Sequence, residues 1–223
     1  MKYSIPTDFS DSLLKSIDSE HVGELYGKLP RDFVGGGRPS FILPSVTKKK
    51  FIAHVKKCRE HGIDFNYLLN STCIGNRELT RSGSRKLKKL LDMLIKAKVS
   101  TVTVSIPYIL EYVKRNYPEL KVSVSVMAGV DSPEKARYWE SLGADRITLP
   151  SVCGLYRNFP LLRQIRNAVS CELKLIANLT CLHRCPLWMY HASGHSHASQ
   201  TGDPSRGFVI DYAYLRCNSL KLE

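Results

Sequence analysis

The chain has 223 residues, 43% of them hydrophobic, and a formal net charge of +13. This length and composition predict a folded protein with a sizeable core, which excludes a disordered chain, and no apolar run approaches the ~20 residues of a membrane span. The positive charge favours anionic partners, from small phosphorylated or carboxylated molecules to RNA, although solvated basic helix faces explain it equally well.

Strand and helix patterns alternate along the chain. The predicted strands cover residues 2–5, 23–26, 64–70, 101–104, 121–127, 146–149 and 172–177. The predicted helices start near residue 10, cover 48–61, start at 82 or 83, and cover 107–117, 132–143 and 158–169. This alternation predicts an α/β fold in which helices cover a parallel sheet, and seven strands in one series indicate a single TIM-like (β/α) barrel over residues 1–223.

The barrel prediction is incomplete at the C-terminal end. A full barrel has eight strand–helix units, and only residues 208–210 have strand character after residue 177. That segment is therefore either the last strand or the barrel stays open. A missing strand would leave an apolar edge, which a second barrel, as a homodimer or a heterodimer, would cover.

A glycine loop follows the second predicted strand. Gly35, Gly36 and Gly37 let the backbone approach a ligand closely, and Arg38 is placed to hold an anion. A flexible turn is the alternative interpretation of the three glycines.

A cysteine- and histidine-rich segment, predicted as a loop over residues 178–217, follows an apolar run at 173–177 that we expect to be a buried strand. It contains candidate thiolate ligands and candidate ligands or acid–base groups: Cys181, Cys185, Cys217, His191, His195 and His197. On spacing alone, zinc and an iron–sulfur cluster are about equally compatible with these residues.

The other cysteines divide into two groups. Cys58 and Cys171 are interpreted as buried structural thiols. Cys73 and the Cys181–Cys185 pair follow strand ends, so the barrel prediction places them on the carboxyl-end face, where Cys153 also lies in a loop. An odd count of seven cysteines, with no leader-like start, predicts a protein of a reducing cytoplasm.

Five segments together resemble the collagenase-like peptidase family, whose peptidases are of unknown catalytic type. They are residues 22–27, 36–38, 65–73, 141–149 and 178–186. The most specific parts are the Asn-x-x-Cys-x-x-x-Cys-Pro element at 178–186 and the Tyr-x-x-Cys element at 214–217.

The resemblance implies a TIM-like barrel and a specific chemistry. The family includes oxygen-independent hydroxylation proteins of ubiquinone biosynthesis and of RNA, and several members hold a [4Fe–4S] cluster on four cysteines. The ligand set it implies here is Cys73, Cys181, Cys185 and Cys217, with Cys153 as the alternative to Cys73. Longer members continue beyond the last cysteine into elements that this chain lacks.

Three functions follow as hypotheses. The first is an iron–sulfur enzyme, or subunit of one, for oxygen-independent hydroxylation, with Arg38 and the three histidines as anion-binding and proton-transfer groups. The second is a metal-dependent peptidase, although no Gly-x-Ser-x-Gly or His-Glu-x-x-His motif occurs. The third is a non-catalytic partner of a second barrel with a structural zinc.

Overall fold

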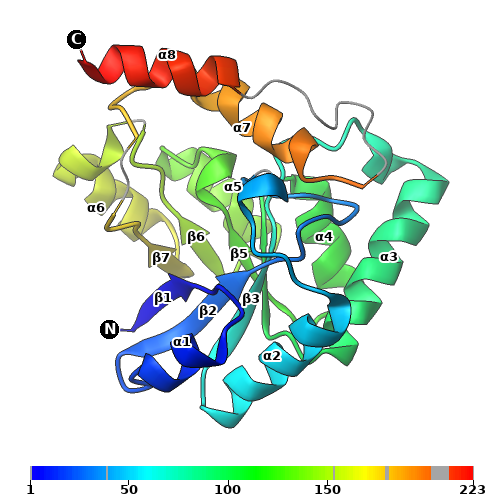
Figure 1. The fold of residues 1–223 in the computed structure, drawn as a ribbon. Helices are drawn as coiled ribbons and strands as arrows, with labels where there is room; N and C mark the ends of the chain where they lie inside the picture. Colours follow the sequence, from blue (N-terminus) through cyan, green and yellow to red (C-terminus); the bar gives the residue numbers. More distant parts are fainter. Residues whose placement is uncertain (1, 39, 153, 179–180, 202–210, 223) are drawn as a thin grey trace.

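A computed structural model describes residues 2–38, 40–152, 154–178, 181–201 and 211–222. Within these residues, seven parallel strands form one sheet in the order of the sequence, and the helices between them cover its outer side (Figure 1). The strands are β1 (Tyr3–Pro6), β2 (Val22–Gly27), β3 (Asp64–Leu69), β4 (Thr101–Val104), β5 (Lys121–Val124), β6 (Arg146–Thr148) and β7 (Glu172–Lys174). The architecture is a TIM-like barrel, as predicted, and it is incomplete in the described part of the chain.

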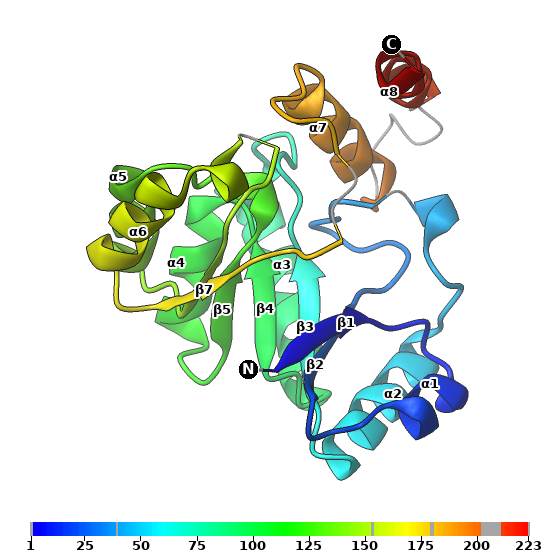
Figure 2. The same cartoon turned by 90° about the vertical axis from the view of Figure 1, so that its left-hand side faces the viewer.

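The helices follow the strands as the alternation predicts. They are α1 (Asp11–Ser16), α2 (Lys48–Glu60), α3 (Arg81–Lys96), α4 (Pro107–Asn116), α5 (Pro133–Ser141), α6 (Phe159–Ala168), α7 (Trp188–Ala198) and α8 (Asp211–Leu222). Turning the molecule by 90° shows α7 and α8 near one another above the carboxyl ends of the strands (Figure 2). These two helices therefore cover the face that carries active sites in barrel enzymes.

Local sequence signals account for α3, the longest helix. The Thr80 hydroxyl caps its first turn by accepting from the Gly83 N–H at 3.0 Å. Leucines spaced three or four residues apart then form one apolar stripe that is buried against the sheet: Leu87, Leu90, Leu91 and Leu94.

Three expectations about the later elements are wrong, and the first two concern predicted strands. The strand predicted to run to residue 127 ends at Val124, because 126–128 form a 3₁₀ turn closed by Gly129 in the left-handed region (φ 63°). The buried strand predicted at 173–177 is the short β7, and Leu175 just beyond it is 55% exposed because β7 is an edge strand. Residues 208–210, the candidate eighth strand, lie outside the described residues.

The third error concerns the predicted loop at 178–217. Much of it is helical, because α7 and α8 occupy most of its described part. The buried residues of α7 are Ala192, His195 and Ser196, so the helix has no continuous apolar stripe that a period of 3.6 would reveal.

Charged side chains connect the two edges of the sheet across its interior. The Glu24 carboxylate on β2 accepts from Arg146 on β6 at 2.8 Å and from Lys174 on β7 at 3.0 Å. Ser4 on β1 donates to the same carboxylate at 2.5 Å. Glu24 therefore joins β1 and β2 to β6 and β7, although the described part of the chain shows no ladder between β1 and β7.

Candidate functional site at the carboxyl ends of the strands

The glycine loop is held between α7 and the end of β3. The Gly36 N–H donates to the Ser199 hydroxyl at 2.8 Å, just beyond the end of α7. On the other side, the Gly37 N–H donates to Asn70 Oδ1 at 3.0 Å. We predicted that the glycine backbone would closely approach a ligand, but here it closely approaches two segments of the protein itself. The loop covers the carboxyl end of β3.

A buried ion pair anchors the start of this loop. The Asp32 carboxylate accepts from the Gly35 N–H at 2.6 Å and from the Tyr67 hydroxyl at 2.8 Å. Lys28 Nζ lies 3.1 Å from Asp32 Oδ2, and the two side chains are only 1% and 3% exposed. Sequence reasoning missed this pair, and the only available signal was an aspartate placed three residues before a glycine run, which is typical of a turn.

His191 and His195 form a pair on one face of α7. They are four residues apart, and their ring centroids lie 4.0 Å from each other. His195 Nδ1 lies 3.0 Å from the Gly37 carbonyl oxygen, so Nδ1 is the nitrogen that donates. His197 lies two residues after His195 and therefore projects from a different side of the helix.

Burial keeps both of these imidazoles neutral at pH 7. Burial and, to a smaller extent, the adjacent His191 lower the pKa of His195 to about 4. Burial also lowers the pKa of His191. The ordinary state of both imidazoles at pH 7 is therefore uncharged, so each can act as a proton acceptor.

Arg38 is exposed at the end of the glycine loop. Its position is open to an anionic ligand that approaches this face, so the predicted role stays a prediction.

Two of the candidate cysteine ligands, Cys73 and Cys185, lie beyond opposite ends of α7. Cys185 precedes the helix, with its carbonyl accepting from the Trp188 N–H at 3.3 Å. The Cys73 carbonyl accepts at 2.6 Å from Gln200 Nε2, beyond the other end. Eleven helical residues span roughly 16 Å, so the structure places Cys73 on the predicted face but does not bring it to the Cys181–Cys185 pair.

Cys217 lies on α8, the helix that follows α7. Tyr190 in the first turn of α7 meets Tyr212 in the first turn of α8 at a ring-centroid distance of 6.0 Å. Cys217 follows on α8 and is half-buried. Thus α8 contacts the N-terminal end of α7, and Cys185 lies just before that same end.

The loops after β6 and β7 also touch at this end. The Arg184 N–H donates to the Val152 carbonyl at 2.5 Å. The His183 ring packs so closely on Gly154 that a Cβ there would lie 2.5 Å from it. Cys153 itself lies outside the described residues.

The remaining two thiols are poor ligands. Burial raises the pKa of Cys58 to about 12, and burial together with Glu140 raises the pKa of Cys171 to about 11. Metal ligation requires the thiolate, which both environments disfavour. Their interpretation as structural residues fits this chemistry, although Cys171 is only half-buried.

No preformed single-ion site contains the cysteines in the part of the chain that the structure describes. There, three or more potential ligand atoms lie within 4.8 Å of one another only in the exposed group Asp18, Glu20 and His21. Four thiolates around one zinc at ~2.3 Å would lie closer together than that limit. The described thiols therefore do not form a closed Cys₄ zinc site in this conformation.

The model of peptidase family U32 matches residues 43–177, more than half of the chain. The chain belongs to peptidase family U32. An uncharacterized protease from Methanocaldococcus jannaschii, MJ1657, is 33% identical over 200 residues, which are 90% of this chain and 57% of that protein. The chain thus spans little more than half the length of this relative.

One solved structure supports this assignment, and a second supports the fold alone. The U32 peptidase Mk0906 superposes with a TM-score of 0.77 at 27% identity, covering 94% of this chain and 81% of that one. The citrate synthase SbnG has a TM-score of 0.50 at 9% identity over 99% of this chain and 93% of its own, a likeness of fold alone. The predicted resemblance and the TIM-like fold are confirmed. Among the described residues, no helix is both long and apolar enough to cross a bilayer.

Proposed function

We propose that this U32 member is an iron–sulfur enzyme, or the cluster-bearing subunit of one, that catalyses an oxygen-independent hydroxylation. The proposal is supported by the contact between the first turns of α7 and α8. It relates α8, which carries Cys217, to the end of α7 that Cys185 precedes, and Cys181 lies four residues before Cys185 in the sequence. Thiols have the donor chemistry that iron–sulfur clusters use. Because the cysteines of a four-iron cluster bind different irons, they need not lie as close together as the ligands of one ion.

The fourth ligand would be Cys153 or Cys73. The contacts of Val152 and Gly154 with the 183–184 loop favour Cys153, because its neighbours in sequence lie beside the Cys181–Cys185 segment. Cys73 would require the loop after β3 or α7 itself to move.

The chain's own residues would bind and orient the substrate beside the cluster. A bound cluster would supply one-electron transfer. Arg38 would pair with an anionic group of the substrate, and the neutral His195 would hold its proton on Nδ1 against the Gly37 carbonyl. This hydrogen bond would keep the imidazole of His195 in one orientation while it or His191 exchanged a proton with the substrate.

Protein purified without oxygen is expected to be brown, with a broad absorbance near ~400 nm and about four irons and four sulfides per chain. Replacing Cys181, Cys185 or Cys217 by serine should remove most of the iron, because each substitution deletes one ligand. Cys171→Ser is the control that should keep it. Iron and sulfide analysis of Cys153→Ser and Cys73→Ser then identifies the fourth ligand.

Stoichiometric zinc in aerobic protein, with no reconstitution by iron and sulfide, would refute this proposal. The family's description as a peptidase supports a second candidate, a hydrolase whose metal-bound water attacks a peptide. Metal-dependent cleavage of gelatin or collagen peptides, lost in Cys181→Ser, would favour that function.

A further inference from the structure

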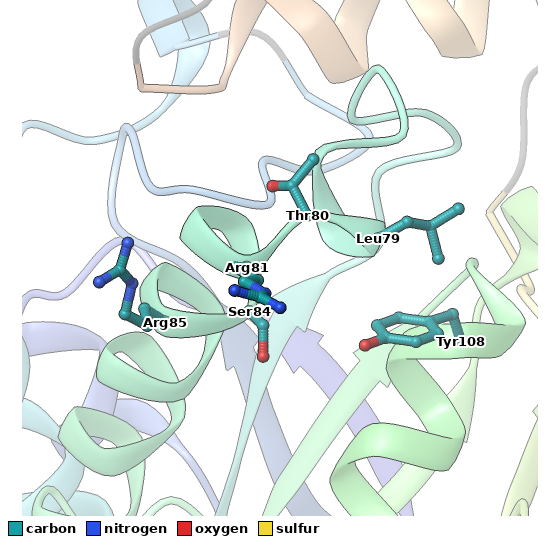
Figure 3. Close-up of a pocket in the computed structure, with 6 residues that line it drawn as sticks. All are labelled: Leu79, Thr80, Arg81, Ser84, Arg85 and Tyr108. Atoms are coloured by element: carbon teal, nitrogen blue, oxygen red, sulfur yellow. The ribbon is translucent and has the colours of Figure 1, made fainter.

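A groove opens at the rim of the carboxyl-end face, between α3 and α4. Its volume is about 550 Å³, within the range of sites that hold small organic ligands. Figure 3 shows Arg81 and Arg85 on one side of it, and Leu79 and Tyr108 on the other. Ser84 and Thr80 complete the lining.

The arginine side of the groove is suited to an oxyanion. Arg81 and Arg85 are four residues apart, so their side chains lie on one face of α3. Both are exposed, and neither is among the ion pairs of the described residues. Two unpaired guanidinium groups with a neighbouring hydroxyl match the bidentate recognition of phosphate.

The position of Arg81 is electrostatically unfavourable for α3. It is the first residue of α3, and the first turn contains no acidic residue. A cation at the positive end of the helix dipole is unfavourable. Tyr108, in the first turn of α4, brings a second helix N-terminus to the groove. A local electrostatic conflict without a compensating ion pair is expected where a ligand supplies the negative charge.

The opposite side offers a flat apolar surface. Leu79 is 66% exposed, and Tyr108 is half-buried with its ring 6.2 Å from that of Tyr112, measured between centroids. An aromatic ring of a ligand can stack on such a tyrosine while its charged group reaches the arginines. Inorganic phosphate alone would leave this side of the groove unused.

We propose that the groove binds a nucleoside phosphate, with its phosphate between Arg81 and Arg85 and its base against Tyr108 and Leu79. None of the six residues that line the groove is a cysteine, and the proposal does not depend on the proposed redox function. It gives a specific role to part of the basic sequence on α3 that a solvated helix face otherwise explains. The same chemistry would serve a free mononucleotide or one unit of a nucleic-acid strand.

Calorimetric titration of the full chain with AMP, adenosine, inorganic phosphate and polyglutamate tests this site. We expect saturable AMP binding that is at least tenfold tighter than binding of adenosine or of phosphate. The Arg81→Gln/Arg85→Gln variant should weaken AMP binding by tenfold or more, since losing one hydrogen bond to a charged group lowers affinity by about tenfold. An oligonucleotide that binds more tightly than AMP, and loses affinity in the same variant, would identify a strand as the source.

Lys48→Gln/Lys49→Gln is the matched control. It also removes two positive charges, but from the exposed first turn of α2, a helix that likewise begins after a threonine cap. It should change AMP affinity less than twofold. The single variant Arg81→Gln should keep or raise the melting temperature while it weakens AMP binding, whereas a merely structural arginine would lower the melting temperature. Equal losses in both double variants, equal binding of polyglutamate, or no saturable AMP binding would overturn the proposal.

Discussion

Replacing Glu24 by glutamine is expected to lower the free energy of unfolding at pH 7 by roughly 3 kcal/mol. Desolvation of this buried carboxylate raises its pKa, but Lys174, Ser4 and Arg146 together outweigh that cost and lower the pKa to about 2. Glutamine removes the charge that these groups stabilise. It also weakens the interior connection between the two edges of the sheet, so urea denaturation should show the loss directly.

The pH dependence of this effect has a defined sign. Since the folded pKa of Glu24 lies below its ordinary value of 4.5, its contribution is complete above that value and is lost as the pH falls toward 2. The difference in stability between the wild type and Glu24→Gln should therefore shrink over this acidic interval. A difference that stayed constant down to pH 2 would contradict the assignment.

Glu172→Gln is the matched control for Glu24→Gln. Glu172 also accepts from Arg146, at 2.7 Å, but its side chain is 68% exposed against 8% for Glu24. Exposed pairs contribute about 0–1 kcal/mol, because water screens them. Equal losses in the two variants would show that burial in the barrel interior is not the source of the stabilisation.

Gly35→Ala is expected to destabilise the protein by roughly 2–5 kcal/mol, the sum of a left-handed backbone and an overpacked contact. Gly35 has φ 77°, and an added Cβ would lie 2.8 Å from the Ser196 carbonyl oxygen and 2.7 Å from Gln200 Cγ. The glycine loop would have to move away from α7. Hydrogen exchange should then show faster exchange of the Gly36 amide, which Ser199 holds at 2.8 Å.

Gly62→Ala separates the two contributions in that prediction. Gly62 has a similar φ of 69°, but an added Cβ there would meet nothing within 4 Å. Its replacement should cost only the backbone part, about 1–2 kcal/mol, and should leave exchange at Gly36 unchanged. If Gly62→Ala cost as much as Gly35→Ala, the packing of the glycine loop on α7 would not be the cause.

Local patterns predicted most of the barrel. The stripe of α3, the Ser132 cap of α5 and the β-branched residues of β4 are all local signals, each contained within one helix or one strand. The prediction failed for α7, where polar side chains are buried. Ser196 and His195 contact segments more than 120 residues away, so the period of the helix itself carries no sign of its environment.

The candidate site shows the same division. Placing Cys73, Cys181 and Cys185 on the carboxyl-end face followed from strand order alone, because parallel strands end at one face. The distance between Cys73 and the pair did not, because it depends on how α7 crosses that face.

By itself, the sequence determined the strand order, the helices that cover the sheet, the family and the set of reactive side chains. The tertiary structure alone decided that Glu24 joins opposite edges of the sheet, that Asp32 and Lys28 are buried together, and that the glycine loop binds α7. The physical reason is the distance along the sequence over which each effect acts. Propensity, capping and periodicity act within a few residues, whereas these contacts join residues that only the packing of the whole barrel brings together.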